Sequence, residues 1–394
     1  MKFIYLTNNI YEQDRMTNNI NIINEQYIKE NKASIEIIYG GNQSNSNLNI
    51  SEEDYSIFLQ KIKLLNETMT KYIMYGGLEL GIGNENNFLI QSTYSYYRND
   101  FKNIFIIDYK IINNTLLIFL NNQINYFGED VLISNTSLKY LQTLEPEKYF
   151  NEMTIGNLIE LEITELTKIL KINLNIKSII FISQSPLFIC EYQKNKINVD
   201  KSLKFLEWVN RYFYLLKDLK IYWVCGDFNN RNETSIITLT KKDNEQNILN
   251  SLSINQYIIG TNYNSDNEEL KQNLKIINET KEFKGQFEIS DDYIDTKWTF
   301  EVKYTIDKIN QNFGFISLDI QDNNSEPKFD FVSYEIIVAE KKDNELKNKD
   351  NELKNNELNT DIKITEEGDP YKEKYLKYKK KLIKLRNNKN KNKT

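Results

Sequence analysis

Short apolar runs bounded by polar and turn-forming residues recur through the first two thirds of the chain, and each has the length of a buried β-strand. They cover residues 3–6, 35–39, 72–75, 104–107, 116–120, 179–182 and 221–225. Apolar residues also recur at helical spacing over 158–170 and over 203–216. Because strands alternate with helices, the pattern predicts an α/β fold, whose ligands lie at the carboxyl ends of the strands.

The pattern changes at about residue 235, because the later apolar runs have no long helical stretch between them. This arrangement is typical of consecutive antiparallel strands, and it predicts that these strands close a second sheet. The runs cover residues 236–239, 257–259, 283–289, 298–304, 313–318 and 329–338.

The globular pattern stops near Lys341, where the heptapeptide KDNELKN occurs twice in succession over 342–355. Its apolar stripe is too thin for a stable coiled coil, so we predict a charged linker over 341–368. The expected organisation is a folded domain over 1–340, this linker, and a basic helix over 369–394.

The last segment has the features of an amphipathic helix. Asp369 can cap its start, Pro370 suits its first position, and residues 371–394 carry eleven Lys or Arg and one acid. Two interpretations stay open: a solvated helix docked on the body, or an interaction helix that self-associates as a coiled-coil tail or sits on an anionic partner. The apolar seam of this helix is Tyr371, Tyr375, Tyr378, Leu382 and Leu385.

Charge and hydropathy narrow the class of protein. The 394 residues include 50 Lys or Arg and 56 Asp or Glu, a net charge of −6, so nucleic-acid binding is not indicated outside the basic tail. No apolar stretch approaches the roughly 18 residues of a membrane span. The apolar run over 3–6 is too short for a signal peptide, and we expect a protein that is not secreted.

Histidine is absent from the whole chain. The scarcity of Ala and Pro indicates an AT-rich genome, but that bias does not explain the missing His, whose codons are of mixed composition. Ser/His/Asp and Cys/His nucleophilic systems are therefore excluded in their ordinary form. The two cysteines, Cys190 and Cys225, are too few for a zinc cluster, and each follows an apolar run that favours a buried free thiol.

Small or amide residues follow five of the predicted strands, at the places where a ligand site is expected. These strand ends read TNN at 7–9, GGN at 40–42, GNEN at 83–86, SQSP at 183–186 and GDFNN at 226–230. In this order they resemble the turns of the calcineurin-like metallophosphoesterases, over about residues 1–260. The resemblance implies a two-sheet αββα sandwich, followed here by the charged linker and the amphipathic helix.

A viral subgroup of that family is more similar still. Its last turn resembles CGDFNN at 225–230, and the run that follows that turn resembles QYIIGT at 256–261. The segment over 367–385 is similar to a C-terminal segment on many proteins of giant, mimivirus-like DNA viruses. We therefore expect a degenerate giant-virus member of the family.

The first half of the family's site falls on residues without suitable side chains. The first Asp-x-His falls near Asn8, and the metal-bridging Asp falls on Gly41. The family's Gly-Asn-His keeps its amide as Asn84, but the catalytic His falls on Glu85. Glu85 could replace the His in hydrogen bonding, yet its negative charge would repel a phosphate.

The second half is equally altered. The histidines before the proline fall on Gln184 and Ser185, and the final His falls on Asn229. Asp227 keeps an acid, but in the viral subgroup that position is not clearly a ligand. Two divalent ions repel one another and need a bridging carboxylate with several imidazoles or carboxylates, so we expect neither a metal pair nor any other cofactor.

The sequence therefore predicts a catalytically inactive, phosphoesterase-like viral protein that acts as a scaffold, binding protein or virion-associated protein. Its expected partners are proteins, virion components among them, and its expected location is the virion or the host cytoplasm. The alternative is a metal-dependent phosphoesterase with one metal held by carboxylates. Glu79, Glu85, Asp108 and Asp227 could converge on one hard cation, or they could be scattered surface acids.

Overall fold

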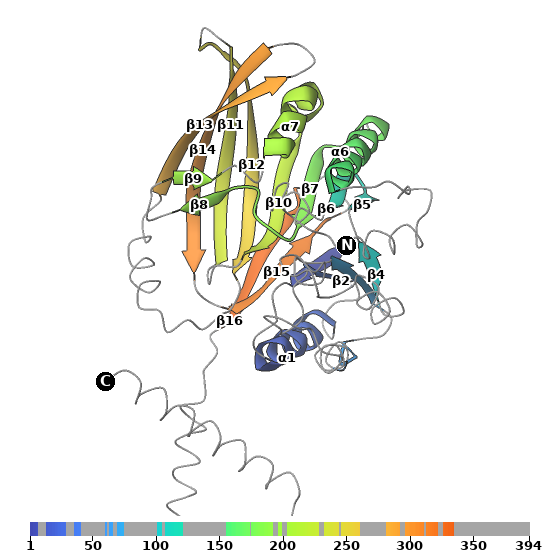
Figure 1. Cartoon of the computed structure of the whole chain (residues 1–394). Helices are drawn as coiled ribbons and strands as arrows, with labels where there is room; N and C mark the ends of the chain where they lie inside the picture. Colours follow the sequence, from blue (N-terminus) through green and yellow to red (C-terminus); the bar gives the residue numbers. More distant parts are fainter. Residues whose placement is uncertain are drawn as a thin grey trace, which may run out of the picture. The chain divides into compact units, whose positions relative to one another are not determined.

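Two mixed β-sheets with few helices form the described part of the chain (Figure 1). These elements belong to the compact unit Met1–Ile336. The computed structural model describes residues 1–6, 13–28, 35–40, 60, 63–65, 69–74, 101–104, 107–120, 155–173, 175–191, 196–198, 203–227, 232–243, 246–260, 281–291, 296–310, 313–321 and 326–334.

The first sheet has six described strands and is called the six-stranded sheet. Its parallel part begins the chain, and each of these strands pairs with the next one in sequence. Two late strands extend it in antiparallel fashion on the other side of β1. The spatial order is β16 (Lys328–Tyr334), β15 (Phe313–Asp319), β1 (Lys2–Leu6), β2 (Ile35–Tyr39), β3 (Thr70–Met74) and β4 (Lys102–Ile104).

The second sheet has eight described strands and is called the eight-stranded sheet. Its four central strands are parallel, and the strands outside them pair in antiparallel fashion. The spatial order is β13 (Lys281–Asp291), β14 (Thr296–Asn310), β11 (Asn232–Lys242), β12 (Ile248–Gly260), β10 (Lys220–Asp227), β7 (Ser178–Ser183), β6 (Thr115–Leu120) and β5 (Ile107–Ile112). A small hairpin joins β8 (Ile189–Glu191) to β9 (Lys196–Asn198).

Two helices cover the outer face of the eight-stranded sheet, as Figure 1 shows. They are α6 (Ile155–Ile172) and α7 (Leu203–Leu216). The ring of Phe205 on α7 lies 5.6 Å from that of Phe181 on β7 and 5.3 Å from that of Trp223 on β10. A bond of 3.1 Å from Trp208 Nε1 to Thr167 Oγ1 ties the two helices together.

The early chain adds α1 (Gln13–Ile22), which continues into a π-helical segment, η1 (Ile23–Ile28). Helix α1 contacts β15 of the six-stranded sheet. Among the helices that the structure describes, none is long and apolar enough to cross a membrane.

The inner faces of the two sheets meet through aromatic side chains. Tyr72 on β3 stacks on Phe119 of β6 with ring centroids 4.9 Å apart. Phe329 on β16 stacks on Tyr257 of β12 at 4.3 Å and packs against Tyr222 of β10 at 4.9 Å. Burial of such rings is the main source of stability for a two-layer arrangement.

The start of this compact unit is tied to the end of β15. The Met1 amino group donates to the Ile320 carbonyl at 2.7 Å, and the Ile320 amide donates to the Met1 carbonyl at 2.9 Å. These two bonds extend the antiparallel pairing of β1 with β15, which begins at Lys2 and Asp319.

The predicted early strands and both predicted helices are confirmed, with one exception. The run over 104–107 contributes to two strands, because β4 ends at Ile104 and β5 begins at Ile107 in the other sheet. Both Ile104 and Ile107 are buried, so the hydropathy of the run does not mark the change of sheet. Cys225 is a buried thiol, as expected, whereas Cys190 lies in β8 and its side chain is outside the described residues.

The prediction that the late strands are antiparallel and close a second sheet is confirmed only in part. Strands β11 to β14 extend the sheet that contains β10, and β12 runs parallel to β10. Strands β15 and β16 instead join β1. The late strands thus divide between both sheets, a choice that depends on contacts far apart in sequence. The predicted linker and tail lie beyond residue 334, outside the described residues.

We expect alkaline pH to weaken the contact around Phe329. Burial, with the nearby carboxylate of Glu326, raises the pKa of Tyr222 to about 12, and burial with Asp307 and Glu326 raises that of Tyr257 to about 12. Their ordinary pKa is 10.0, so the folded state holds these protons more tightly. Stability is complete below pH 10 and falls as pH rises towards 12.

Urea unfolding between pH 9 and pH 12 measures this effect. The wild-type midpoint should fall more steeply above pH 10 than the midpoint of Tyr222→Phe/Tyr257→Phe. The control is Tyr214→Phe, whose side chain is 62% exposed and should leave the slope unchanged. Equal slopes for the double variant and wild type would contradict the prediction.

Candidate functional site

The carboxyl ends of β1, β2, β7 and β10 form the edge where the sequence predicts a site. Backbone pairing continues one residue beyond the strands in both sheets, because Gly40 N donates to Leu6 O at 2.7 Å and Gly226 N donates to Gln184 O at 3.1 Å. The Tyr5 hydroxyl crosses between the sheets and donates to Ser183 O at 2.7 Å. One hydrogen bond therefore joins the two halves of this edge.

The turn after β7 is held by hydrogen bonds at almost every residue. Besides the bonds to Ser183 O and Gln184 O, the Ser185 carbonyl accepts from Ser183 Oγ at 2.8 Å and from Trp223 Nε1 at 3.1 Å. The Leu187 amide donates to Gln256 Oε1 at 2.8 Å. Three consecutive carbonyls and one amide thus have fixed partners, which makes the turn rigid.

The Gln184 side chain has no such partner. It is 2% exposed, and within the part of the chain that the structure describes neither Oε1 nor Nε2 makes a hydrogen bond. Gln184 is the first residue after β7, which ends at Ser183. A rigid turn therefore holds a buried, unpaired carboxamide.

Gly40 is required beside this edge for a steric reason. A Cβ atom at this position would lie 2.1 Å from the Tyr5 hydroxyl and 2.6 Å from Tyr5 Cζ. The Tyr5 ring is 1% exposed and its hydroxyl is fixed on Ser183, so the ring cannot easily move away. A side chain at Gly40 and the Tyr5 bridge exclude one another.

Among the predicted site positions, the structure describes two side chains and brings both to the edge. Gln184 and Ser185 lie in the turn, and both are buried. Asp227 ends β10, but its side chain is outside the described residues. The remaining site positions, and the five residues of the predicted interaction helix, fall outside the described residues: Asn8, Gly41, Asn84, Glu85, Asn229, Tyr371, Tyr375, Tyr378, Leu382 and Leu385.

Of the acids considered for a single cation, only Asp108 has a described side chain. It lies on β5, where it pairs with Lys102 at 2.9 Å and accepts from Tyr109 N at 2.8 Å. Within the described ranges, no three His, Cys, Asp or Glu residues are grouped closely enough to hold a metal ion. Asp108 therefore belongs to a salt bridge between the sheets.

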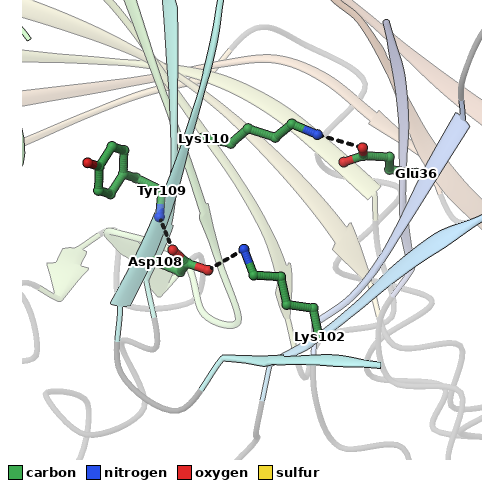
Figure 2. Close-up of polar contacts among 5 residues, drawn as sticks. All are labelled: Glu36, Lys102, Asp108, Tyr109 and Lys110. Carbon is green, nitrogen blue, oxygen red and sulfur yellow. Dashed lines mark hydrogen bonds and ion pairs between the residues drawn. The ribbon is translucent and has the colours of Figure 1, made fainter. Parts of the chain in front are cut away.

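Figure 2 shows that this salt bridge has a second one beside it. Lys110 of β5 lies 2.5 Å from Glu36 of β2, and the Glu36 side chain is 9% exposed. Burial, the Glu36 charge and a hydrogen bond to Glu36 raise the pKa of the adjacent Tyr72 hydroxyl, with a smaller effect from Asp108. Two ion pairs thus connect β2 and β4 to the edge strand β5.

A second polar cluster lies under the outer face of the eight-stranded sheet. The Tyr304 hydroxyl donates to the fully buried Glu233 carboxylate and accepts from Ser235 Oγ and Gln256 Nε2, each at 3.0 Å. Gln256 also holds Leu187 N, so this network supports the turn after β7. These residues are not among the predicted site residues. Glu233 and Ser235 nevertheless share the period-two positions of buried Ile237, a pattern that indicates their burial.

Comparison with known proteins adds little to this picture. No family model matches the chain, and no curated protein matches it. Among solved structures, the chain is similar to "GAP50 the anchor in the inner membrane complex of Plasmodium", at 13% identity over 86% of this chain and 87% of that chain, with a TM-score of 0.42. A likeness of this degree assigns neither a family nor a function.

Gly40→Ala should destabilise the protein by about 1–3 kcal/mol, because the new methyl group overlaps the Tyr5 ring. In a Tyr5→Leu background the same change should cost much less, since the hydroxyl and Cζ are gone. Urea unfolding of the four proteins of this double-mutant cycle gives the coupling energy. Equal costs in both backgrounds would show that the two residues do not compete for space.

Lys110→Met should cost about 3 kcal/mol, because it leaves the Glu36 carboxylate buried without its cation. Replacing both partners, as Glu36→Leu/Lys110→Met, should recover part of that loss. The matched control is Lys168→Met, which breaks an exposed pair with Glu165 and should cost about 0.5 kcal/mol or less. The prediction fails if the two single lysine variants have the same urea midpoint.

Proposed function

We propose that this chain is a non-catalytic relative of the calcineurin-like metallophosphoesterases, a viral αββα protein that keeps the frame and has lost the metal ligands. The observation that carries the proposal is the turn after β7. Gln184 and Ser185 stand where the resemblance expects histidines, and both are buried in a turn with fixed hydrogen bonds. A neutral amide and a hydroxyl occupy a position built for metal ligation in the family.

The electrostatics of the edge support the same proposal. The described side chains at the carboxyl ends of β1, β2, β7 and β10 are all neutral. They are Tyr5, Leu6, Ile38, Tyr39, Ile182, Ser183, Gln184, Ser185, Val224 and Cys225. Two adjacent divalent ions need several anionic or imidazole ligands to offset their repulsion. The chain contains no imidazole, and the bridging carboxylate of the family falls on Gly41. Without these groups, a stable pair of ions and a general acid are both missing.

The arrangement of strands and helices supports the proposed αββα frame. Both sheets are mixed, and their parallel parts end at the same edge, joined by the bond from Tyr5 to Ser183. Helices α6 and α7 pack on the outer face of the eight-stranded sheet, and α1 contacts β15 of the other sheet. The αββα layering, the viral origin and the family assignment are parts of the proposal.

The proposed role is that of a scaffold or binding protein. Residues 371–394 carry eleven basic residues and one acid, with the Tyr/Leu seam among them. Such a segment suits association with proteins or with an anionic surface. Protein partners, virion components among them, and a location in the virion or the host cytoplasm follow from the proposal.

Metal analysis together with a phosphatase assay tests the catalytic part of the proposal. The purified chain should hold metal at a stoichiometry near zero. It should not hydrolyse nitrophenyl phosphates or cyclic nucleotides in the presence of Mn²⁺, Zn²⁺ or Mg²⁺. Two metals per chain, or turnover that disappears in Asp227→Ala, would overturn the proposal and favour the carboxylate-based hydrolase.

Restoring ligands tests whether the positions are assigned correctly. Gly41→Asp/Gln184→His/Asn229→His should raise the affinity for Zn²⁺ at least tenfold in a calorimetric titration, because the resemblance assigns metal ligands to these three positions. The matched control is Asn19→His/Asn210→His/Asn247→His, which adds imidazoles on α1, on α7 and beside β12. Similar Zn²⁺ affinities for the two triple variants would argue against the assignment.

A further inference from the structure

The Gln184 carboxamide is a buried polar group that the chain itself leaves unsatisfied. It is 2% exposed, and among the described residues neither of its polar atoms has a hydrogen-bond partner. An unpaired donor and an unpaired acceptor, both removed from water, cost free energy that folding does not recover. Such a group is explained if a ligand completes its hydrogen bonds.

The surroundings of Gln184 are built to hold this side chain still. Its own carbonyl is fixed by Gly226 N, and the carbonyls on either side are fixed by Tyr5, Ser183 and Trp223. Gln256 then fixes the end of the turn through Leu187 N. A ligand that binds here does not have to order the turn first, so little affinity is lost to ordering.

The position is the one where open sheets bind ligands. Gln184 follows the carboxyl end of β7, its carbonyl accepts from Gly226 N near the end of β10, and the preceding Ser183 carbonyl accepts from Tyr5 of β1. The crevice outside the carboxyl ends of parallel strands is the general ligand position in such sheets. Asn19 is also buried with both amide atoms unpaired among the described residues, but it lies within the helix α1 and does not follow a strand.

We propose that this edge binds a neutral molecule that presents a hydrogen-bond donor next to an acceptor, as the N6/N7 edge of adenine or a carboxamide does. The donor would bind Gln184 Oε1 and the acceptor would bind Gln184 Nε2, the bidentate pairing that glutamine makes with adenine. This inference rests on the proposed function, because it assigns a ligand to the same edge once metals are gone.

The charge at the edge argues for a neutral ligand over a phosphate. Phosphate binding needs cationic side chains or a cluster of free backbone N–H groups. The described side chains at the ends of β1, β2, β7 and β10 include neither Lys nor Arg. The backbone amides of Gly40, Gly226 and Leu187 are already used within the protein. A carboxamide has no charge to offset the desolvation of an anion.

Calorimetric titration of the full chain tests the proposal with four probes: adenosine, nicotinamide, purine riboside and inorganic phosphate. Purine riboside lacks the N6 donor of adenosine, so it is a matched ligand control. Adenosine or nicotinamide should bind, adenosine at least tenfold more tightly than purine riboside, and phosphate should not bind. The proposal is overturned if neither adenosine nor nicotinamide binds, or if purine riboside or phosphate binds as tightly as they do.

Variants locate the site. Gln184→Leu should weaken the binding of adenosine or nicotinamide at least tenfold, and Asn19→Leu should leave it unchanged. Unchanged binding in Gln184→Leu would overturn the assignment to this turn. If Gln184→Leu does not fold, the comparison of adenosine with purine riboside on the wild-type chain still tests the proposal. Metal content is measured on the same preparation. Two bound metals refute the proposed function, whereas near-zero metal without binding of either neutral probe refutes this inference alone.

Discussion

The packing of one sheet against the other is the constraint on which the rest of the structure depends. Aromatic rings fill the space between the inner faces, from Tyr72 and Phe119 to Tyr257 and Phe329. Between β5 and β2, the salt bridge of Lys110 with Glu36 also connects the two sheets. At the carboxyl edge, the Tyr5 hydroxyl joins the sheets. The relative position of the strand ends, and hence of any site there, is set by these contacts.

The sequence predicts the local element well where a single pattern of apolar residues extends through a whole segment. Fully buried strands such as β6 and β7 contain continuous apolar runs, and α7 occupies the residues over which its apolar spacing extends. It was not informative about which sheet a strand joins. β15 pairs with β1 across more than three hundred positions, and no local pattern encodes such a partner. The boundary between β4 and β5 was not predicted, because these two strands join different sheets and the local pattern does not show it.

The sequence predicts where Gln184 and Ser185 stand in the fold, because both directly follow β7, and their role in a site stays a prediction. The order of the strand-end motifs gives no information on side-chain contacts. It could not indicate that Tyr5 and Gly40 share one space, since that competition depends on a contact between neighbouring strands. The period-two pattern of β11 indicates that Glu233 is buried, but its partners Tyr304 and Gln256 lie on strands far away in sequence, so the network itself was not predictable.

The pairing of Met1 and Lys2 with Ile320 and Asp319 has a consequence for how the protein is made. During synthesis β1 leaves the ribosome more than three hundred residues before its antiparallel neighbour β15. At roughly 5–20 residues per second, one edge of β1 waits for at least about 15 seconds without its final partner. Long-range pairing of this kind slows folding, and exposed strand edges favour aggregation in the interval.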